Sequence, residues 1–182
     1  MIKKTLLAFL LSVCSFCAFS QGLQNFDFYY GHPLVSLEAK EYYARQFDVN
    51  SNNKAYSILD STFTNNDETR PFYIYLACRM LTEARGDLLA ELNIICRQIA
   101  EIFPSSLVAV LYAGRNYIND NAKHFWAARM ATEIRITCNA DLMVCFKDSR
   151  STSVKNCDPQ YKNRLEVLYN LVRKDLNLFQ QR

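Results

Sequence analysis

The chain contains three segments that read as helical hairpins, and they follow one another at nearly equal spacing. They begin near residues 38, 72 and 107, so each starts about 34 or 35 residues after the previous one. A period of that length is typical of stacked helical repeats, in which each hairpin buries its apolar face against its neighbours. The spacing therefore predicts an all-α fold, either a short array of stacked antiparallel helical hairpins or an irregular helical bundle.

Local signals indicate where these helices begin and end. Ser36 is a suitable N-cap for the first helix, and Pro71 fits the first turn of another, where its missing N–H is not needed. Gly86-Asp87 predicts the turn of the second hairpin, and Pro104 predicts its end. A closing helix is expected from about residue 159 to residue 179, because apolar side chains recur there at steps of three and four. These side chains are Leu165, Leu168, Val172, Leu176 and Phe179.

The first twenty residues have the three parts of a secretory signal peptide. Lys3 and Lys4 form a charged start, an apolar stretch follows, and Ala18-Phe19-Ser20 precedes Gln21. The apolar stretch is shorter than the ~20 residues that a membrane-spanning helix needs. We expect cleavage after Ser20 and export to the periplasm or out of the cell, the alternative being an ordinary buried helix. A Gln after the cleavage site resembles exported envelope proteins of Bacteroidetes-type bacteria.

The charge of the expected mature chain gives little indication of its partners. Without Lys3 and Lys4, 19 basic residues stand against 18 acidic ones, a net charge near +1. A nearly neutral surface offers no electrostatic argument for nucleic acid or an anionic membrane. No second apolar segment approaches membrane length, so we expect no transmembrane segment in the mature chain.

We expect residues 36–182 to form a single helical domain. Two segments of the chain are not expected to be helical, one before this domain and one within it. Residues 21–35 carry several aromatic side chains around a Gly31-His32-Pro33 turn and predict an extended arm that packs on the helical body. The alternative is an exposed aromatic strip that binds a partner or a second copy. Residues 148–158 are polar and rich in serine, which predicts a long surface loop.

An odd number of cysteines would remain after cleavage, in a compartment where cysteines tend to pair. They are Cys78, Cys96, Cys138, Cys145 and Cys157. We hypothesise that Cys157, in the predicted loop, is linked to Cys138 or Cys145. Cys78 and Cys96 should lie at similar heights on adjacent helices, where they either pair or stay as buried thiols. Zinc is not expected, because structural zinc sites usually place cysteine pairs two to four residues apart.

No motif in the sequence predicts catalysis. His32 and His124 are the two histidines, and histidine is the commonest general base near neutral pH. Neither stands in a serine, cysteine or carboxylate motif, so both are predicted to be structural or surface residues. The chain also lacks a Gly-rich phosphate loop, and we expect neither enzymatic activity nor a cofactor.

The hairpins resemble those of the tetratricopeptide family, most clearly over residues 70–137. Gly114 and Tyr117 match the small residue and the aromatic residue that lie three apart in the family's first helix. In that pattern the glycine lets the two helices of a hairpin approach closely. Gly86-Asp87 matches the usual turn, and Pro104 matches the proline that ends a repeat.

This resemblance implies that the protein binds a protein or peptide partner on the inner face made by the first helices. The ligand-facing positions of the family correspond here to Arg115 and Asn119, a cation and an amide suited to a peptide backbone or carboxylate. The implied function is that of an exported adaptor in the cell envelope. Two alternatives remain: a small envelope enzyme or inhibitor that uses an unpaired cysteine or His32, and a bundle that self-associates through residues 21–35.

Overall fold

The structure is a computed structural model that describes residues 24–51, 53–114, 118–138 and 141–180, without the side chains of Phe26 and residues 178–180. The described residues form helices joined by short turns and include no strand, so the predicted all-α class is confirmed. The predicted signal peptide lies outside the described residues.

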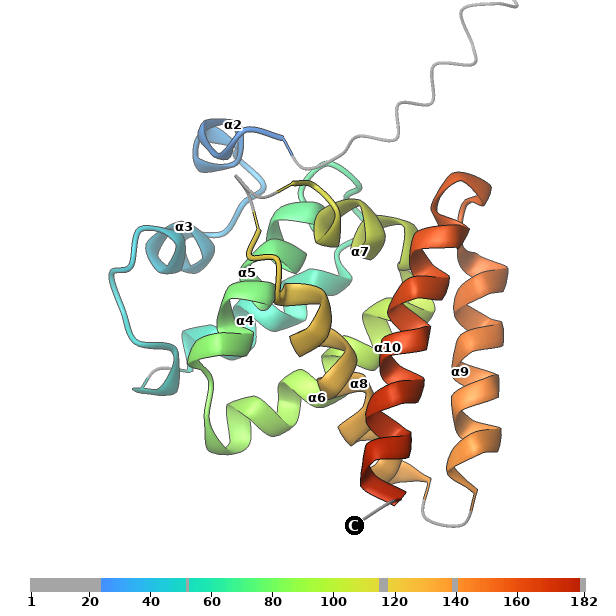
Figure 1. The fold of residues 1–182 in the computed structure, drawn as a ribbon. Helices are drawn as coiled ribbons and strands as arrows, with labels where there is room; N and C mark the ends of the chain where they lie inside the picture. The colour runs from blue at the N-terminus through green and yellow to red at the C-terminus, as the bar shows by residue number, and fades with distance from the viewer. Residues whose placement is uncertain (1–23, 52, 115–117, 139–140, 181–182) are drawn as a thin grey trace, which may run out of the picture.

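Three short helices form a group on one side of the molecule (Figure 1). They are α2 (Phe26–Gly31), α3 (Leu37–Tyr43) and α4 (Lys54–Asp60), with the 3-10 turns η2 (Val49–Ser51) and η3 (Ser61–Phe63) before and after α4. Ser36 caps α3 as predicted, because its Oγ accepts the Ala39 N–H at 3.2 Å. The cap explains why α3 begins directly after this residue.

The predicted extended arm is helical instead. Residues 26–31 form α2, and the side chain of Asn25 accepts the Asp27 N–H at its start. Tyr29 is fully buried and stacks on Phe72 with their ring centroids 4.8 Å apart. The segment therefore packs an aromatic ring on the helical body as expected, but a local cap favours a helical turn over the extended conformation.

The centre of the molecule is α5 (Arg70–Glu83), whose residues 70 to 78 are all buried. Pro71 lies in its first turn, as predicted. α6 (Gly86–Ile102) begins at Gly86, which has a φ of +54°. Pro104 then starts α7 (Pro104–Leu111), which is bent by 111° from α6. Proline cannot continue a helix, so the bend occurs at the predicted residue.

Gly114 does not lie within a helix, in contrast to its place in the repeat pattern. α7 ends at Leu111, and Gly114 follows in a turn with a φ of +102°. A Cβ atom at this position would meet nothing within 4 Å. The glycine therefore serves the turn, where a positive φ is needed, and it does not bring two helices together.

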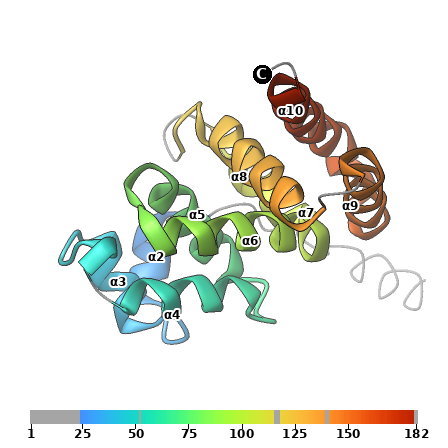
Figure 2. The same ribbon diagram turned by 90° about the horizontal axis from the view of Figure 1, so that it is seen from below.

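The other side of the molecule is a pair of long helices, α9 (Leu142–Asn156) and α10 (Lys162–Gln180), joined by the short turn η4 (Pro159–Tyr161). They lie side by side in both views (Figures 1 and 2). α8 (Ala122–Thr137) packs between α6 and α10. Leu165, Leu168, Val172 and Leu176 are buried as the periodicity predicts. The side chain of Phe179 lies outside the described part.

The predicted surface loop at 148–158 is wrong, because residues 148–156 continue α9. Asp141 caps this helix, with its Oδ1 accepting the N–H groups of Met143 and Val144. Ser149 and Ser153 place their hydroxyls 3.1 Å and 2.6 Å from the Tyr169 hydroxyl on α10. The serines thus lie on one buried helical face, a tertiary contact that composition does not reveal.

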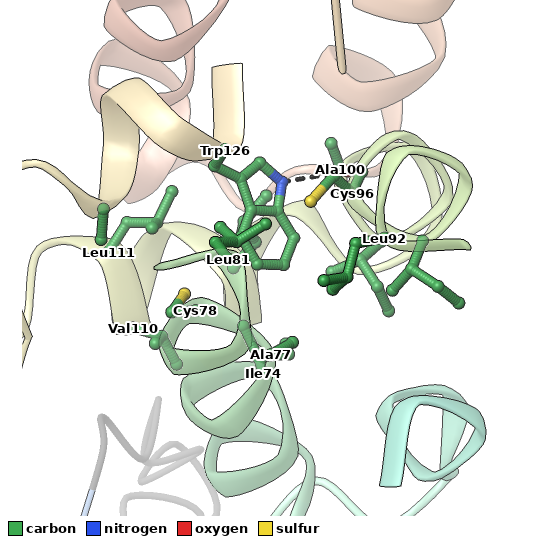
Figure 3. Close-up of a cluster of buried hydrophobic side chains, with 14 of the residues drawn as sticks. Ile74, Ala77, Cys78, Leu81, Leu92, Cys96, Ala100, Val110, Leu111 and Trp126 are labelled. Atoms are coloured by element: carbon green, nitrogen blue, oxygen red, sulfur yellow. Dashed lines mark hydrogen bonds between the residues drawn. The ribbon is translucent and has the colours of Figure 1, made fainter. Parts of the chain in front are cut away.

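A cluster of buried apolar side chains surrounds Trp126 of α8, which lies against α5 and α6 (Figure 3). The indole is fully buried, and its Nε1 donates to the Cys96 carbonyl oxygen at 3.0 Å. Cys78 and Cys96 belong to the same cluster. Among the described helices, none alone is long and apolar enough to cross a membrane. The bent pair of α6 and α7 reaches the required length and apolar character only when the two helices are taken together.

Candidate functional site

A cavity of about 800 Å³ lies where three connections of the chain converge. Its lining residues come from the start of α5 and the turn before it (67–71), from the bend between α6 and α7 (102–109), and from the turn between α9 and α10 (156–161). The cavity opens to solvent, since Asp67, Ile102 and Asp158 are exposed. These segments are far apart in sequence, and the fold alone brings them together.

Arg70 forms a buried part of the cavity wall. Its Nε donates to the Thr64 carbonyl oxygen at 2.9 Å, and its Nη1 donates to the Asp67 carboxylate. Its guanidinium carbon also lies 3.8 Å from the centroid of the Phe103 ring. A buried charge needs such partners, and a cation over an aromatic face is attracted to it. Arg70 therefore joins the start of α5 to the α6–α7 bend.

Hydrogen bonds also join the third wall of the cavity, residues 156–161, to the bend between α6 and α7. The Ser105 Oγ accepts the Asp158 N–H at 2.9 Å, and the Asn156 Nδ2 donates to the Glu101 carbonyl oxygen at 2.7 Å. Both bonds link the turn between α9 and α10 to the bend between α6 and α7. The cavity is therefore held by cross-links between its walls, which leaves it preformed.

The cavity surface combines apolar and acidic groups. Ile102 is 50% exposed there, and Phe103 and Tyr161 are partly buried. The carboxylates are those of Asp67, Glu68 and Asp158, all three on exposed residues. An apolar patch with a few convergent polar groups is the usual character of a ligand site.

The Glu68 carboxylate also connects the cavity to the N-terminal helices. His32 Nε2 lies 3.5 Å from Glu68 Oε2, while His32 Nδ1 accepts the Leu34 N–H at 3.2 Å. His124, the other histidine, is exposed on α8. In the part of the chain that the structure describes, neither histidine is hydrogen-bonded to a hydroxyl or thiol that could act as a nucleophile.

The two residues predicted to bind a partner do not line this cavity. Arg115 lies outside the described residues. Asn119 is exposed in the turn before α8, where its Oδ1 accepts the Asn121 N–H at 2.9 Å. This turn follows the C-terminal end of α7, whereas the cavity lies at the N-terminal end of α7. The surface at Arg115 and Asn119 stays a prediction.

The cysteine pairing differs from the hypothesis. Cys138 and Cys145 form a disulfide with their Cα atoms 6.3 Å apart, and Cys157 is free, so the proposed Cys157 link is wrong. The reason is the length of α9. Cys157 follows the far end of this helix, roughly 18 Å along its axis from Cys145 at a rise of 1.5 Å per residue.

The described free cysteines are poor candidates for a reactive thiol. Cys78 and Cys96 are buried and not linked to each other, which agrees with the buried-thiol alternative. Burial raises the pKa of both thiols well above the usual range. Burial also raises the pKa of Cys157, against an opposing effect of its hydrogen bond with Ser105. Nucleophilic cysteines have lowered pKa values and some exposure.

Within the described ranges, no group of three His, Cys, Asp or Glu side chains could hold a metal ion. Sequence reasoning did not find the cavity, because no short motif connects its three segments. The nearest signal is Arg70, an arginine followed by eight apolar residues at the start of α5. No protein-family model, curated protein or solved structure matches the chain. The likeness to tetratricopeptide repeats therefore stays a prediction.

Proposed function

We propose that this protein is an exported binding or adaptor protein that holds a peptide segment of a protein partner in the cell envelope. The segment binds in the cavity lined by residues 67–71, 102–109 and 156–161. The observation that carries this proposal is the cavity itself, whose volume of about 800 Å³ lies within the usual range of ligand sites.

The chemistry of the cavity suits a peptide. Ile102 and Tyr161 offer apolar contact for a side chain, while the Ser106 hydroxyl and the Gln160 amide can exchange hydrogen bonds with a peptide backbone. The cross-links through Arg70 and Ser105 hold the walls before a ligand arrives. A preformed site loses less conformational entropy on binding, which favours affinity.

Two further features support export. The first twenty residues have the composition of a signal peptide. Cys138 and Cys145 form a disulfide, and disulfides persist mainly in oxidising compartments outside the cytosol.

The proposal is tested with a displayed library of random dodecamer peptides, selected against residues 21–182. Ile102→Ser removes a half-exposed apolar side chain of the cavity, and Ile136→Ser is its matched control on α8, where the isoleucine is 62% exposed outside the cavity. We expect Ile102→Ser to weaken binding of the selected peptides about tenfold, and Ile136→Ser to leave binding unchanged.

Asn119→Ala separates this site from the surface that the repeat resemblance predicts. The cavity site predicts that selected peptides bind Asn119→Ala as tightly as the unchanged protein. If Asn119→Ala lost binding while Ile102→Ser bound the peptides normally, the peptide site would lie at the turn before α8. That result would contradict the proposal.

Self-association is a second candidate function, favoured by one specific observation. Four large apolar side chains are exposed within one stretch of ten residues near the N-terminus, residues 28–37. They are Phe28, Tyr30, Leu34 and Leu37. Sedimentation over a range of concentrations tests this candidate with Leu37→Ser, using Val167→Ser on α10 as the control. A concentration-dependent dimer that only Leu37→Ser disrupts would support it, and a monomer at every concentration would exclude it.

A further inference from the structure

We infer that the peptide segment held in this cavity presents a lysine or arginine side chain to Glu68 and Asp158. The inference rests on the proposed function and specifies the chemistry of its ligand. It depends on the charge of the cavity walls, on the fixed position of Arg70 and on the apolar surface beside the carboxylates.

The walls carry more negative than positive charge. Among the described residues that line the cavity, Asp67, Glu68 and Asp158 are acidic and Arg70 alone is a lysine or arginine. Asp67 is the ion-pair partner of Arg70, so these two charges compensate each other. The carboxylates of Glu68 and Asp158 come from two different walls, and Glu68 Oε2 lies 3.5 Å from His32 Nε2, which carries a compensating charge only when that histidine is protonated. A cation between the two carboxylates would interact favourably with both.

Arg70 is not positioned to receive an anionic ligand. Its Nε and Nη1 are engaged by Thr64 and Asp67, and its guanidinium lies against the Phe103 ring. The N-terminus of α7 also faces the cavity through Ser105 and Ser106, but a helix end contributes only about half a positive charge. The charge of two carboxylates exceeds this effect, and an acidic peptide would be repelled.

The apolar surface explains why a long cationic side chain fits better than a small cation. Lysine and arginine pack their methylene stems on apolar groups while their charged ends remain hydrated or paired. Ile102 and Tyr161 provide such a surface within the same cavity that carries Glu68 and Asp158. A cationic head can also interact with the face of a tyrosine ring.

The experiment uses peptides selected from the dodecamer library and synthesised with acetylated N-termini, so that only side chains carry positive charge. Each peptide is paired with a version in which norleucine replaces its lysine, which keeps the stem and removes the charge. The protein variants are Glu68→Gln combined with Asp158→Asn, and Asp148→Asn as a control at an exposed carboxylate of α9. Asp158 makes no side-chain cap hydrogen bond, so its replacement removes none.

We expect the selected peptides to be enriched in lysine or arginine and to bind the double variant about tenfold more weakly. Asp148→Asn should bind normally, and the norleucine peptides should bind the double variant and the unchanged protein equally. Peptides that lose affinity with Ile102→Ser but bind the double variant unchanged would overturn the cationic ligand while the peptide site stands. Peptides that are insensitive to Ile102→Ser would overturn both.

Discussion

Trp126 combines complete burial with a single polar contact. Its ring is fully buried, and its Nε1 atom reaches the Cys96 carbonyl oxygen on the neighbouring helix α6. A buried indole N–H without a partner would be unfavourable. Trp126 therefore requires both a space that fits its ring and a hydrogen-bond acceptor opposite its Nε1. This contact fixes α8 against α6 more specifically than apolar packing alone.

Trp126→Phe tests that contact. The change removes the hydrogen bond and leaves space in the core, so we expect it to lower the free energy of unfolding by about 1–3 kcal/mol. The measurement is denaturant unfolding followed by circular dichroism, since Trp126 is the one tryptophan of the chain. Phe125→Leu, at an exposed neighbour, is the control. Equal midpoints for Trp126→Phe and the unchanged protein would contradict the prediction.

Glu133 is a single residue that should make the free energy of unfolding depend on pH. It is buried on α8, and desolvation raises its pKa, with Arg97 lowering it and Glu91 raising it further. An acid whose pKa is raised in the folded state binds its proton more tightly there than in the unfolded chain. The ionised carboxylate therefore destabilises the fold above this pKa, and the destabilisation disappears as the pH falls through it.

Glu133→Gln should accordingly be more stable than the unchanged protein at pH 7, and its advantage should shrink towards acidic pH. The free energy of unfolding of both proteins, measured at intervals from pH 4 to pH 7, checks this. A glutamine variant that is less stable at pH 7, or a difference that does not vary with pH, would show that the interaction with Arg97 exceeds desolvation.

At the scale of elements, helix ends were the most predictable feature. Ser36, Pro71, Gly86 and Pro104 act locally, and each marks a helix boundary or bend in the structure. The failure at residues 148–158 has a tertiary cause, because Ser149 and Ser153 bond to Tyr169 across α9 and α10. Gly114 lies in the turn after α7, where its φ is +102°. Composition and spacing do not encode the contact between α9 and α10.

The disulfide between Cys138 and Cys145 closes the connection between α8 and α9, and its removal should weaken this junction. In the chain-entropy model, a loop of this length gives about 2–3 kcal/mol of stabilisation. We expect the double change Cys138→Ser and Cys145→Ser to lower the free energy of unfolding by that amount. Cys157→Ser should leave the bond intact. Finding Cys157 in a disulfide in non-reduced peptide mass spectra would contradict the pairing.

At the scale of the whole molecule, the cavity results from the meeting of three connections. Its walls lie about 35 and 50 residues apart in sequence, so no repeat pattern or short motif predicts that Glu68, Ile102 and Asp158 share one surface. The all-α class follows from helical periodicity, which is a local property. The site depends on the angle between α6 and α7 and on the turn between α9 and α10, which are properties of the assembled fold.

The most direct test of this account is the affinity of library-selected peptides for Ile102→Ser and for Ile136→Ser, measured by calorimetry on the mature chain. The account predicts about tenfold weaker binding to Ile102→Ser and unchanged binding to Ile136→Ser. Equal affinities for the two variants, or selection that yields no binding peptide, would contradict the claim that the cavity holds a peptide.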